Sequence, residues 1–183
     1  LHKTGLGAEK LLEKVLLRAK ELVLKGTKLP ASKAFNYFLI NQINEENFNS
    51  ETLKIFAKLD DFDVLASMKE WISNKDLILS KLSESLINRK LPKVELQNHP
   101  FTKEEIESTK DNVKKTFNLN NDEVNYLVYS GKISNQAYDS TQNTIKLVFK
   151  NGDIKDVIEA SDHLNIQALS KPVNKYYLCY PKK

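Results

Sequence analysis

Residues 86–96 read Leu-Ile-Asn-Arg-Lys-Leu-Pro-Lys-Val-Glu-Leu, and the periodicity of the chain changes within this stretch. Upstream of it, apolar residues recur at intervals of three and four, as they do on one face of a helix. From Leu91 to Leu96, apolar and polar residues alternate as in a strand, and Pro92 disfavours a helical conformation at Leu91. The stretch therefore predicts the point at which a helical half of the chain ends.

The upstream half predicts helices joined by short polar turns. The first helix is expected over 7–25, because its apolar residues share one face and Gly26 provides a stop. The residues of that face are Leu12, Val15, Leu16, Ala19, Leu22 and Val23. The same spacing predicts further helices over 31–42, 50–59, 61–73 and 75–88.

The downstream half predicts a small α+β unit. Thr102 and Glu105 form a capping-box pattern that begins a helix over 103–117. Alternation predicts strands over 124–128, 145–149, 154–158 and 173–180, with Asn151-Gly152 in a type I′ hairpin turn. We therefore expect an α+β fold with antiparallel strands, divided into a helical region over 1–97 and a small α+β domain over 98–183.

The composition is that of an ordinary globular protein, with 183 residues, of which 40% are apolar and 28% charged. The formal charge of +4 comes from interleaved signs and is a weak indication of anionic partners. No apolar run approaches the roughly 20 residues that a membrane span needs, so no membrane association is expected. A single cysteine, Cys179, and the lack of a signal-peptide pattern favour the cytoplasm.

Residues that carry chemistry are scarce. His2, His99 and His163 lie far apart without ligand spacing, so we expect no metal site and no cofactor within this chain, and His99 and His163 are interpreted as exposed loop residues. Cys179 is interpreted as a buried, inert thiol in a strand. The acidic run 60–63 is interpreted as a helix N-terminus, and no glycine-rich phosphate loop is present. The sequence therefore predicts no catalytic residue.

Basic residues at the change of periodicity allow two interpretations. In an extended segment Arg89, Leu91 and Lys93 would share one side and could bind a nucleotide. The two cations would contact its phosphate or base acceptors, and Leu91 would pack against its base or sugar. The alternative is a helix C-terminus at which the cations meet the helix dipole. Spacing alone favours this alternative.

Tyrosines and lysines are mixed near the end of the chain. Lysines at 171, 175, 182 and 183 surround Tyr176, Tyr177 and Tyr180, a combination that can stack on single-stranded nucleic acid. At strand spacing, such tyrosines are more often half-buried sheet residues. A nucleic-acid-binding or protein-interaction module is therefore the alternative function rather than the preferred one.

Several motifs together resemble a known family. They are His2-Lys3-Thr4, Ala8-Glu9-Lys10, Leu29-Pro30, the acidic run 60–63, the stretch 86–93, and segments within 133–138, 159–162 and 176–181. In this order they resemble the C-terminal half of bacterial, Bacteroidetes-type HD-domain phosphohydrolases. These enzymes are relatives of the vertebrate SAM-and-HD-domain deoxynucleotide triphosphohydrolase. The resemblance covers essentially the whole chain.

The resemblance implies a regulatory and oligomerisation part without a catalytic centre. The family hydrolyses deoxynucleoside triphosphates to deoxynucleoside and triphosphate at a metal held by His, His-Asp and Asp, and this sequence lacks that signature. Position 1 is Leu rather than Met, so we expect an excised C-terminal piece, inactive alone, of an enzyme whose divalent metal ion lies in the missing half.

The resemblance also assigns a binding role to the basic residues. By position, His2 and Lys3 match family residues that contact an activating nucleotide, and Arg89, Leu91 and Lys93 match an element lining the activator pocket at the subunit interface. Pro92 departs from the family pattern within that element. The implied partners are a deoxynucleotide or GTP activator, bound weakly by the isolated piece, and further copies of the chain in a homo-oligomer.

Overall fold

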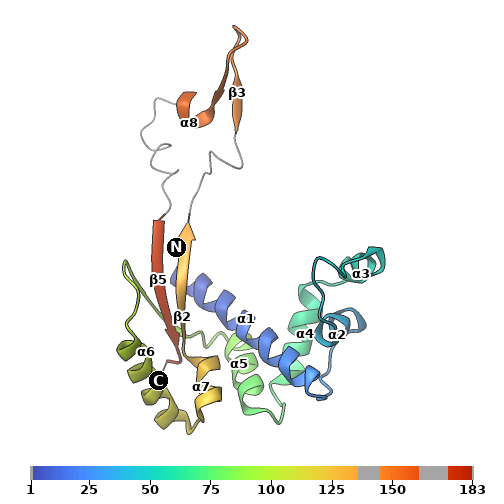
Figure 1. Ribbon diagram of the computed structural model, residues 1–183. Coiled ribbons are helices and arrows are strands. Elements are labelled where there is room, and N and C mark those ends of the chain that lie inside the picture. Colours follow the sequence, from blue (N-terminus) through green and yellow to red (C-terminus); the bar gives the residue numbers. More distant parts are fainter. Residues whose placement is uncertain (1, 136–144, 161–172, 183) are drawn as a thin grey trace.

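The architecture is α+β, with helices first and antiparallel strands later, as predicted (Figure 1). The computed structural model describes residues 2–135, 145–160 and 173–182. The helices are α1 (Lys3–Leu24), α2 (Lys33–Ile40), α3 (Ser50–Phe56), α4 (Asp61–Trp71), α5 (Leu77–Ile87), α6 (Lys103–Phe117), α7 (Asn121–Leu127) and α8 (Val157–Ala160). The strands are β1 (Lys93–Gln97), β2 (Tyr129–Asn135), β3 (Lys146–Val148), β4 (Ile154–Asp156) and β5 (Val173–Tyr180). The division at residues 97 and 98 stays a prediction.

Polar side chains at the helix starts explain where the helices begin. Asp60 accepts hydrogen bonds from the backbone of α4 while Asp63 accepts from the Asp60 amide, which confirms that the acidic run caps a helix. Thr102 and Glu105 form the expected capping box, and α6 has the predicted bounds. The starts of these two helices follow from the sequence because capping satisfies free backbone amides locally.

The main core lies where α1 crosses α4 and α5. The inward stripe of α1 includes Val15 and Ala19, both fully buried, and it meets Met68 and Trp71 of α4 and Leu79 of α5. Burial of these side chains supplies most of the energy that holds the helices together, at roughly 1.5–3 kcal/mol for each large one.

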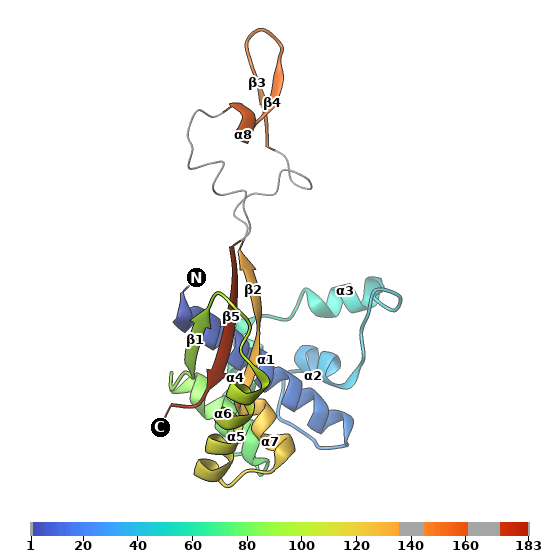
Figure 2. The same ribbon diagram turned by 60° about the vertical axis from the view of Figure 1, so that its left-hand side comes forward.

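A three-stranded sheet joins the middle of the chain to its end, in the order β1-β5-β2 with antiparallel neighbours (Figure 2). On one face Leu178 packs into the main core with Val113 of α6. On the other face Leu6 of α1 packs with Val94 and Cys179. The sheet therefore lies between the start of α1 and α6.

One predicted strand is wrong. Residues 121–127 form helix α7 where a strand was expected over 124–128, and β2 begins only at Tyr129. Asn120 and Glu123 form a capping box that starts this helix. Val124, Tyr126 and Val128 alternate, but the buried residues Val124, Leu127 and Val128 also fit the spacing of a helix. The capping box therefore favours the helix over the strand in this segment.

The predicted hairpin is present, but its turn differs. β3 and β4 pair with Val148 opposite Ile154, and α8 replaces the end of the strand expected to reach residue 158. Only Gly152 has a positive φ there, +87°, so the turn is not type I′, which needs two such residues. The Phe149 amide donates to the Asp153 carbonyl, and the loop has three residues with a glycine bulge.

Candidate functional site

The start of α1 lies against the segment that leads into β1. Gly7 has no side chain, and a Cβ there would lie 3.0 Å from Val94 Cγ2 and 3.6 Å from Pro92 Cγ. This close approach brings the segment of His2 and Lys3, near one end of the chain, beside the segment that carries Leu91 and Lys93. The two segments that carry the candidate residues, distant in sequence, are thus neighbours in the fold, while Lys93 points to the opposite face of the sheet from Val94.

Arg89 ends α5 in a left-handed conformation, with φ at +55°. Its amide donates to the Leu86 carbonyl at 3.2 Å and the Lys90 amide donates to the Ser85 carbonyl at 2.8 Å, which is the Schellman pattern. The local geometry is therefore the helix C-terminus, and the extended alignment of Arg89 with Leu91 and Lys93 is wrong, since β1 begins only at Lys93. The role of these residues in binding stays a prediction.

The residue type at this helix end is unusual. Among the described residues, Gly26 and Asn118 also adopt positive φ just past helices, and both types tolerate it, whereas an arginine there costs roughly 1 kcal/mol. The Arg89 side chain is exposed and forms no ion pair with any residue of the described ranges. A strained backbone with an unpaired guanidinium is typical of a functional constraint.

Lys93 faces a carboxylate and an aromatic ring. Its Nζ lies 2.8 Å from Glu95 Oε1 and 5.3 Å from the centre of the Tyr180 ring. The Tyr180 hydroxyl donates to the same Glu95 oxygen at 2.6 Å. Lys93, then Tyr180 and more weakly Lys3, lower the pKa of Glu95, and Glu95 raises the pKa of Lys93. Glu95 therefore pairs with Lys93 and neutralises part of its charge.

Of the histidines and the cysteine that the structure describes, His99 and Cys179 lie in the surroundings that the sequence predicts for them. His2 occupies the N-cap position of α1 without a side-chain hydrogen bond, and His99 is exposed. His163 lies outside the described residues. Cys179 is fully buried, and burial raises its pKa to about 11, which confirms an inert thiol. Within residues 2–135, 145–160 and 173–182 no three metal-ligating side chains come together.

The C-terminal tyrosines belong to the sheet. Tyr177 is buried with its ring over Gly131, where a Cβ would lie 2.5 Å from the hydroxyl oxygen. Tyr180 is tied to Glu95, and Tyr176 is half-buried. These tyrosines are sheet residues, as the spacing favours, rather than a free stacking surface; Lys171 and Lys183 lie outside the described residues.

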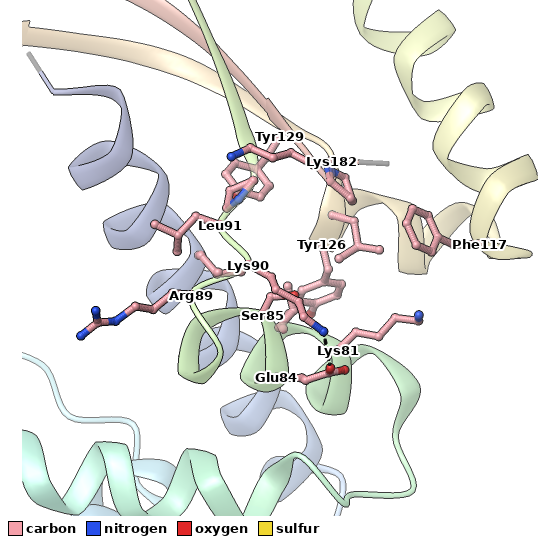
Figure 3. A pocket seen from close by; sticks show the side chains of 15 residues that line it. Lys81, Glu84, Ser85, Arg89, Lys90, Leu91, Phe117, Tyr126, Tyr129 and Lys182 are labelled. Atoms are coloured by element: carbon pink, nitrogen blue, oxygen red, sulfur yellow. Dashed lines mark hydrogen bonds and ion pairs between the residues drawn. The ribbon is translucent and has the colours of Figure 1, made fainter.

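A pocket of about 490 Å³ includes Arg89 and Leu91 in its lining (Figure 3). Its lining comes from α1, α5, the end of α6, α7 and the last residues of the chain. The side chains are Leu11, Lys81, Leu82, Glu84, Ser85, Arg89, Lys90, Leu91, Pro92, Phe117, Tyr126, Leu127, Tyr129, Pro181 and Lys182. Part of the lining comes from the segment 81–92, and the other residues come from α1, α6, α7, β2 and the chain end, whose separation along the chain carries no sequence signal.

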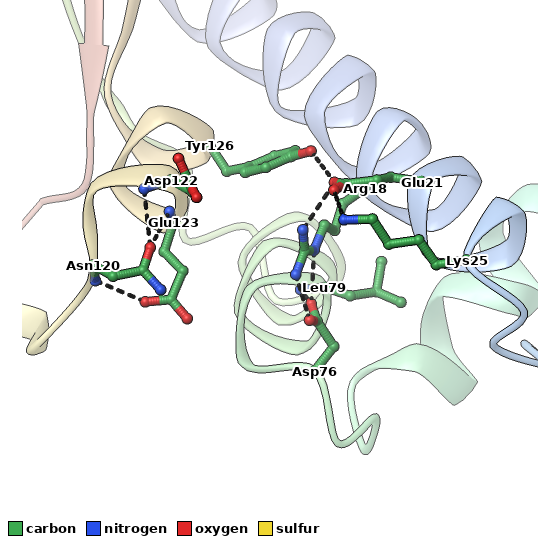
Figure 4. Close-up of polar contacts among 9 residues, drawn as sticks. All are labelled: Arg18, Glu21, Lys25, Asp76, Leu79, Asn120, Asp122, Glu123 and Tyr126. Carbon is green, nitrogen blue, oxygen red and sulfur yellow. Dashed lines mark hydrogen bonds and ion pairs between the residues drawn. The ribbon is translucent and has the colours of Figure 1, made fainter.

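A polar network holds one wall of this pocket in place (Figure 4). Tyr126 of α7 donates its hydroxyl to Glu21 of α1, and Arg18 reaches both Glu21, at 2.8 Å, and Asp76 at the start of α5. The Arg18 guanidinium also lies 5.2 Å from the centre of the Tyr126 ring. The network therefore connects three of the elements that line the pocket.

No helix among the described residues is long and apolar enough to cross a membrane. No protein-family model matches the chain, and no curated protein matches it. Among solved structures, the chain is similar to a phosphohydrolase from Bacteroides thetaiotaomicron, with 41% identity and a TM-score of 0.86. The similarity covers 100% of this chain but 46% of that one, so the chain spans about half the length of its relative. This protein is therefore related over its whole length to part of a phosphohydrolase.

Proposed function

We propose that this chain is the regulatory and oligomerisation part of an HD-type deoxynucleoside triphosphate triphosphohydrolase and has no catalysis of its own. In this proposal His2, Lys3, Arg89, Leu91 and Lys93 hold an activating nucleotide, a deoxynucleotide or GTP. The observation that carries the proposal is the packing of the start of α1 on Pro92 and Val94, which brings the two basic segments together. The similarity to a phosphohydrolase supports the reaction class.

The charges suit a polyphosphate. Lys3, Arg89 and Lys93 are exposed cations, and Arg89 presents an unpaired guanidinium suited to bidentate contact with phosphate. Glu95 neutralises part of this charge, because it pairs with Lys93. We therefore expect weak binding by the chain alone and tighter binding where additional residues, from the rest of the enzyme or from neighbouring copies, complete the site.

The proposal assigns no metal-binding role to this chain. Across the described ranges, histidines, cysteines and carboxylates do not gather into a ligand set. We derive no metal-dependent step for this chain.

The test is a titration of the chain with dGTP and GTP by isothermal calorimetry. Arg89→Ala and Lys93→Ala are each expected to weaken binding by about tenfold, the loss of one charge-assisted contact. Lys103→Ala, an exposed lysine at the start of α6, is the matched control and is expected to leave the affinity unchanged.

Two results would contradict the proposal. One is an affinity that all three alanine variants leave unchanged, which would place the nucleotide elsewhere. The other is hydrolysis of dGTP by the purified chain, which would show a catalytic centre within it. Sedimentation velocity with and without dGTP tests the oligomerisation role, for which a nucleotide-dependent shift to larger species is expected.

A further inference from the structure

The pocket beside α5 combines an apolar interior with a basic rim. Leu82 and Leu127 are buried in its walls, and Leu91 and Pro181 add apolar surface. Aromatic rings line it as well, namely those of Phe117, Tyr126 and Tyr129. Pockets of this size with a few polar groups are typical sites for small molecules.

The charges at the pocket are predominantly positive. Lys81, Arg89, Lys90 and Lys182 contribute four cations to the lining, against the single carboxylate of Glu84. Lys90 pairs with Glu84 at 3.0 Å. Lys81 and Lys182 have no carboxylate within ion-pair distance in the part of the chain that the structure describes. The pocket is therefore complementary to an anion.

The two free lysines lie beside aromatic rings on different sides of the pocket. The Nζ atom of Lys81 lies 5.0 Å from the centre of the Phe117 ring. In Figure 3 the Lys182 side chain lies on the side of Tyr129. A planar ring placed between the aromatic walls would leave its anionic group within reach of an ammonium group.

The walls are held in place before any ligand binds. Tyr126 is anchored through Glu21 to Arg18, and Arg18 is anchored to Asp76 at the start of α5 (Figure 4). α5 carries Lys81 and Leu82, so the same contacts position both a cation and an apolar wall. A pre-organised cavity loses less entropy on binding than one that must form.

We propose that this pocket binds a small molecule that has a planar aromatic ring and a phosphate group. The ring lies against Phe117, Tyr126 and Leu127, and the phosphate interacts with Lys81, whose ammonium group lies beside the Phe117 ring. None of these residues belongs to the set proposed for the nucleotide, but Arg89 and Leu91 of that set also line the pocket, so the experiment must distinguish two sites from one.

The probe is 1-naphthyl phosphate, titrated into the chain and followed by calorimetry and by the fluorescence of the naphthyl ring. 1-Naphthol and inorganic phosphate serve as the ring-only and anion-only probes. Binding of 1-naphthyl phosphate at least about tenfold tighter than either is expected, because the pocket engages both parts.

Lys81→Ala is expected to weaken this binding by at least about fivefold, and Lys182→Ala, on the other side of the pocket, is expected to have a smaller effect. Both side chains are at least partly exposed, so neither change removes core packing. Phe117→Leu is expected to weaken binding while keeping an apolar side chain at the site. Lys103→Ala is the control and leaves binding unchanged.

Three results would overturn the proposal. They are no measurable binding of 1-naphthyl phosphate, equal affinity for inorganic phosphate alone or naphthol alone, and binding that Lys81→Ala leaves unchanged. Lys93→Ala separates this site from the nucleotide site, because it is expected to weaken dGTP binding while 1-naphthyl phosphate binds as before. Loss of both ligands in Lys93→Ala would show one shared site and would overturn the assignment of a second site to this pocket.

Discussion

Arg18 on α1 contacts both carboxylate oxygens of Asp76, with Nε 3.1 Å from Oδ1 and Nη2 2.6 Å from Oδ2. Asp76 is also the N-cap of α5, where it accepts a hydrogen bond from the Leu79 amide at 2.8 Å. One carboxylate thus starts a helix and ties it to α1. Burial alone would raise the pKa of Asp76, but the Arg18 guanidinium and the Leu79 amide outweigh it and lower that pKa.

Asp76→Ala is expected to lower the free energy of unfolding by about 2–3 kcal/mol, through loss of the helix cap and of a partly buried charge partner for Arg18. Urea denaturation followed by circular dichroism measures the change. The control is Asp111→Ala, an exposed carboxylate on α6, which is expected to change stability by less than about 0.5 kcal/mol. Equal effects of the two changes would contradict a special role for the Arg18–Asp76 pair.

Acid is expected to weaken the contact between α1 and α7. The Lys25 ammonium, the Tyr126 hydroxyl and the Arg18 guanidinium lower the pKa of Glu21 from its ordinary value of 4.5 to about 2. Because the folded-state pKa is the lower one, the stabilisation is fully present above about pH 5 and is lost as the pH falls toward 2. The thermal midpoint should decrease over this range, and Glu21→Gln should show a shallower decrease than the unmodified chain.

Arg89→Gly is expected to leave stability unchanged or to raise it by up to about 1 kcal/mol, because glycine adopts a positive φ without strain. The same change is expected to weaken dGTP binding. Gly26→Ala is the converse control, since residue 26 has φ at +92° and an alanine there is expected to cost about 1 kcal/mol. Chemical denaturation and calorimetry on the same samples report the two effects. A large loss of stability in Arg89→Gly would show that the arginine serves the fold rather than a ligand.

Substitution of two glycines of α1 tests how closely this helix packs on β1. Around Gly5 nothing lies within 4 Å of an added Cβ, so Gly5→Ala is expected to stabilise the helix by about 0.5–1 kcal/mol. At Gly7 the added Cβ meets Val94 and Pro92, so Gly7→Ala is expected to be less stable than Gly5→Ala by at least about 1 kcal/mol. Thermal unfolding of both variants gives the comparison. Equal stability would mean that the close packing of α1 on β1 is absent in solution.

Local signals explain which elements could be predicted. The capping box of Thr102 and Glu105 was readable because it satisfies backbone amides within one turn, and α6 begins where it predicts. The error at 124–128 arose because Val124, Tyr126 and Val128 suit a strand and a helix equally well over so short a segment. The positive φ of Arg89 could not be predicted, since arginine gives no local indication of a left-handed conformation.

The sequence by itself determined the α+β class, the starts of α4 and α6 and the change of periodicity near Leu91, because each depends on interactions between residues a few positions apart. It also supplied the family resemblance on which the five candidate binding residues rest. Only the tertiary structure decided that Tyr180 shares Glu95 with Lys93, and that Lys81, Phe117, Tyr126 and Lys182 line one pocket. These contacts depend on how α1, α5, α7 and the sheet pack, and packing brings together residues whose separation along the chain carries no signal.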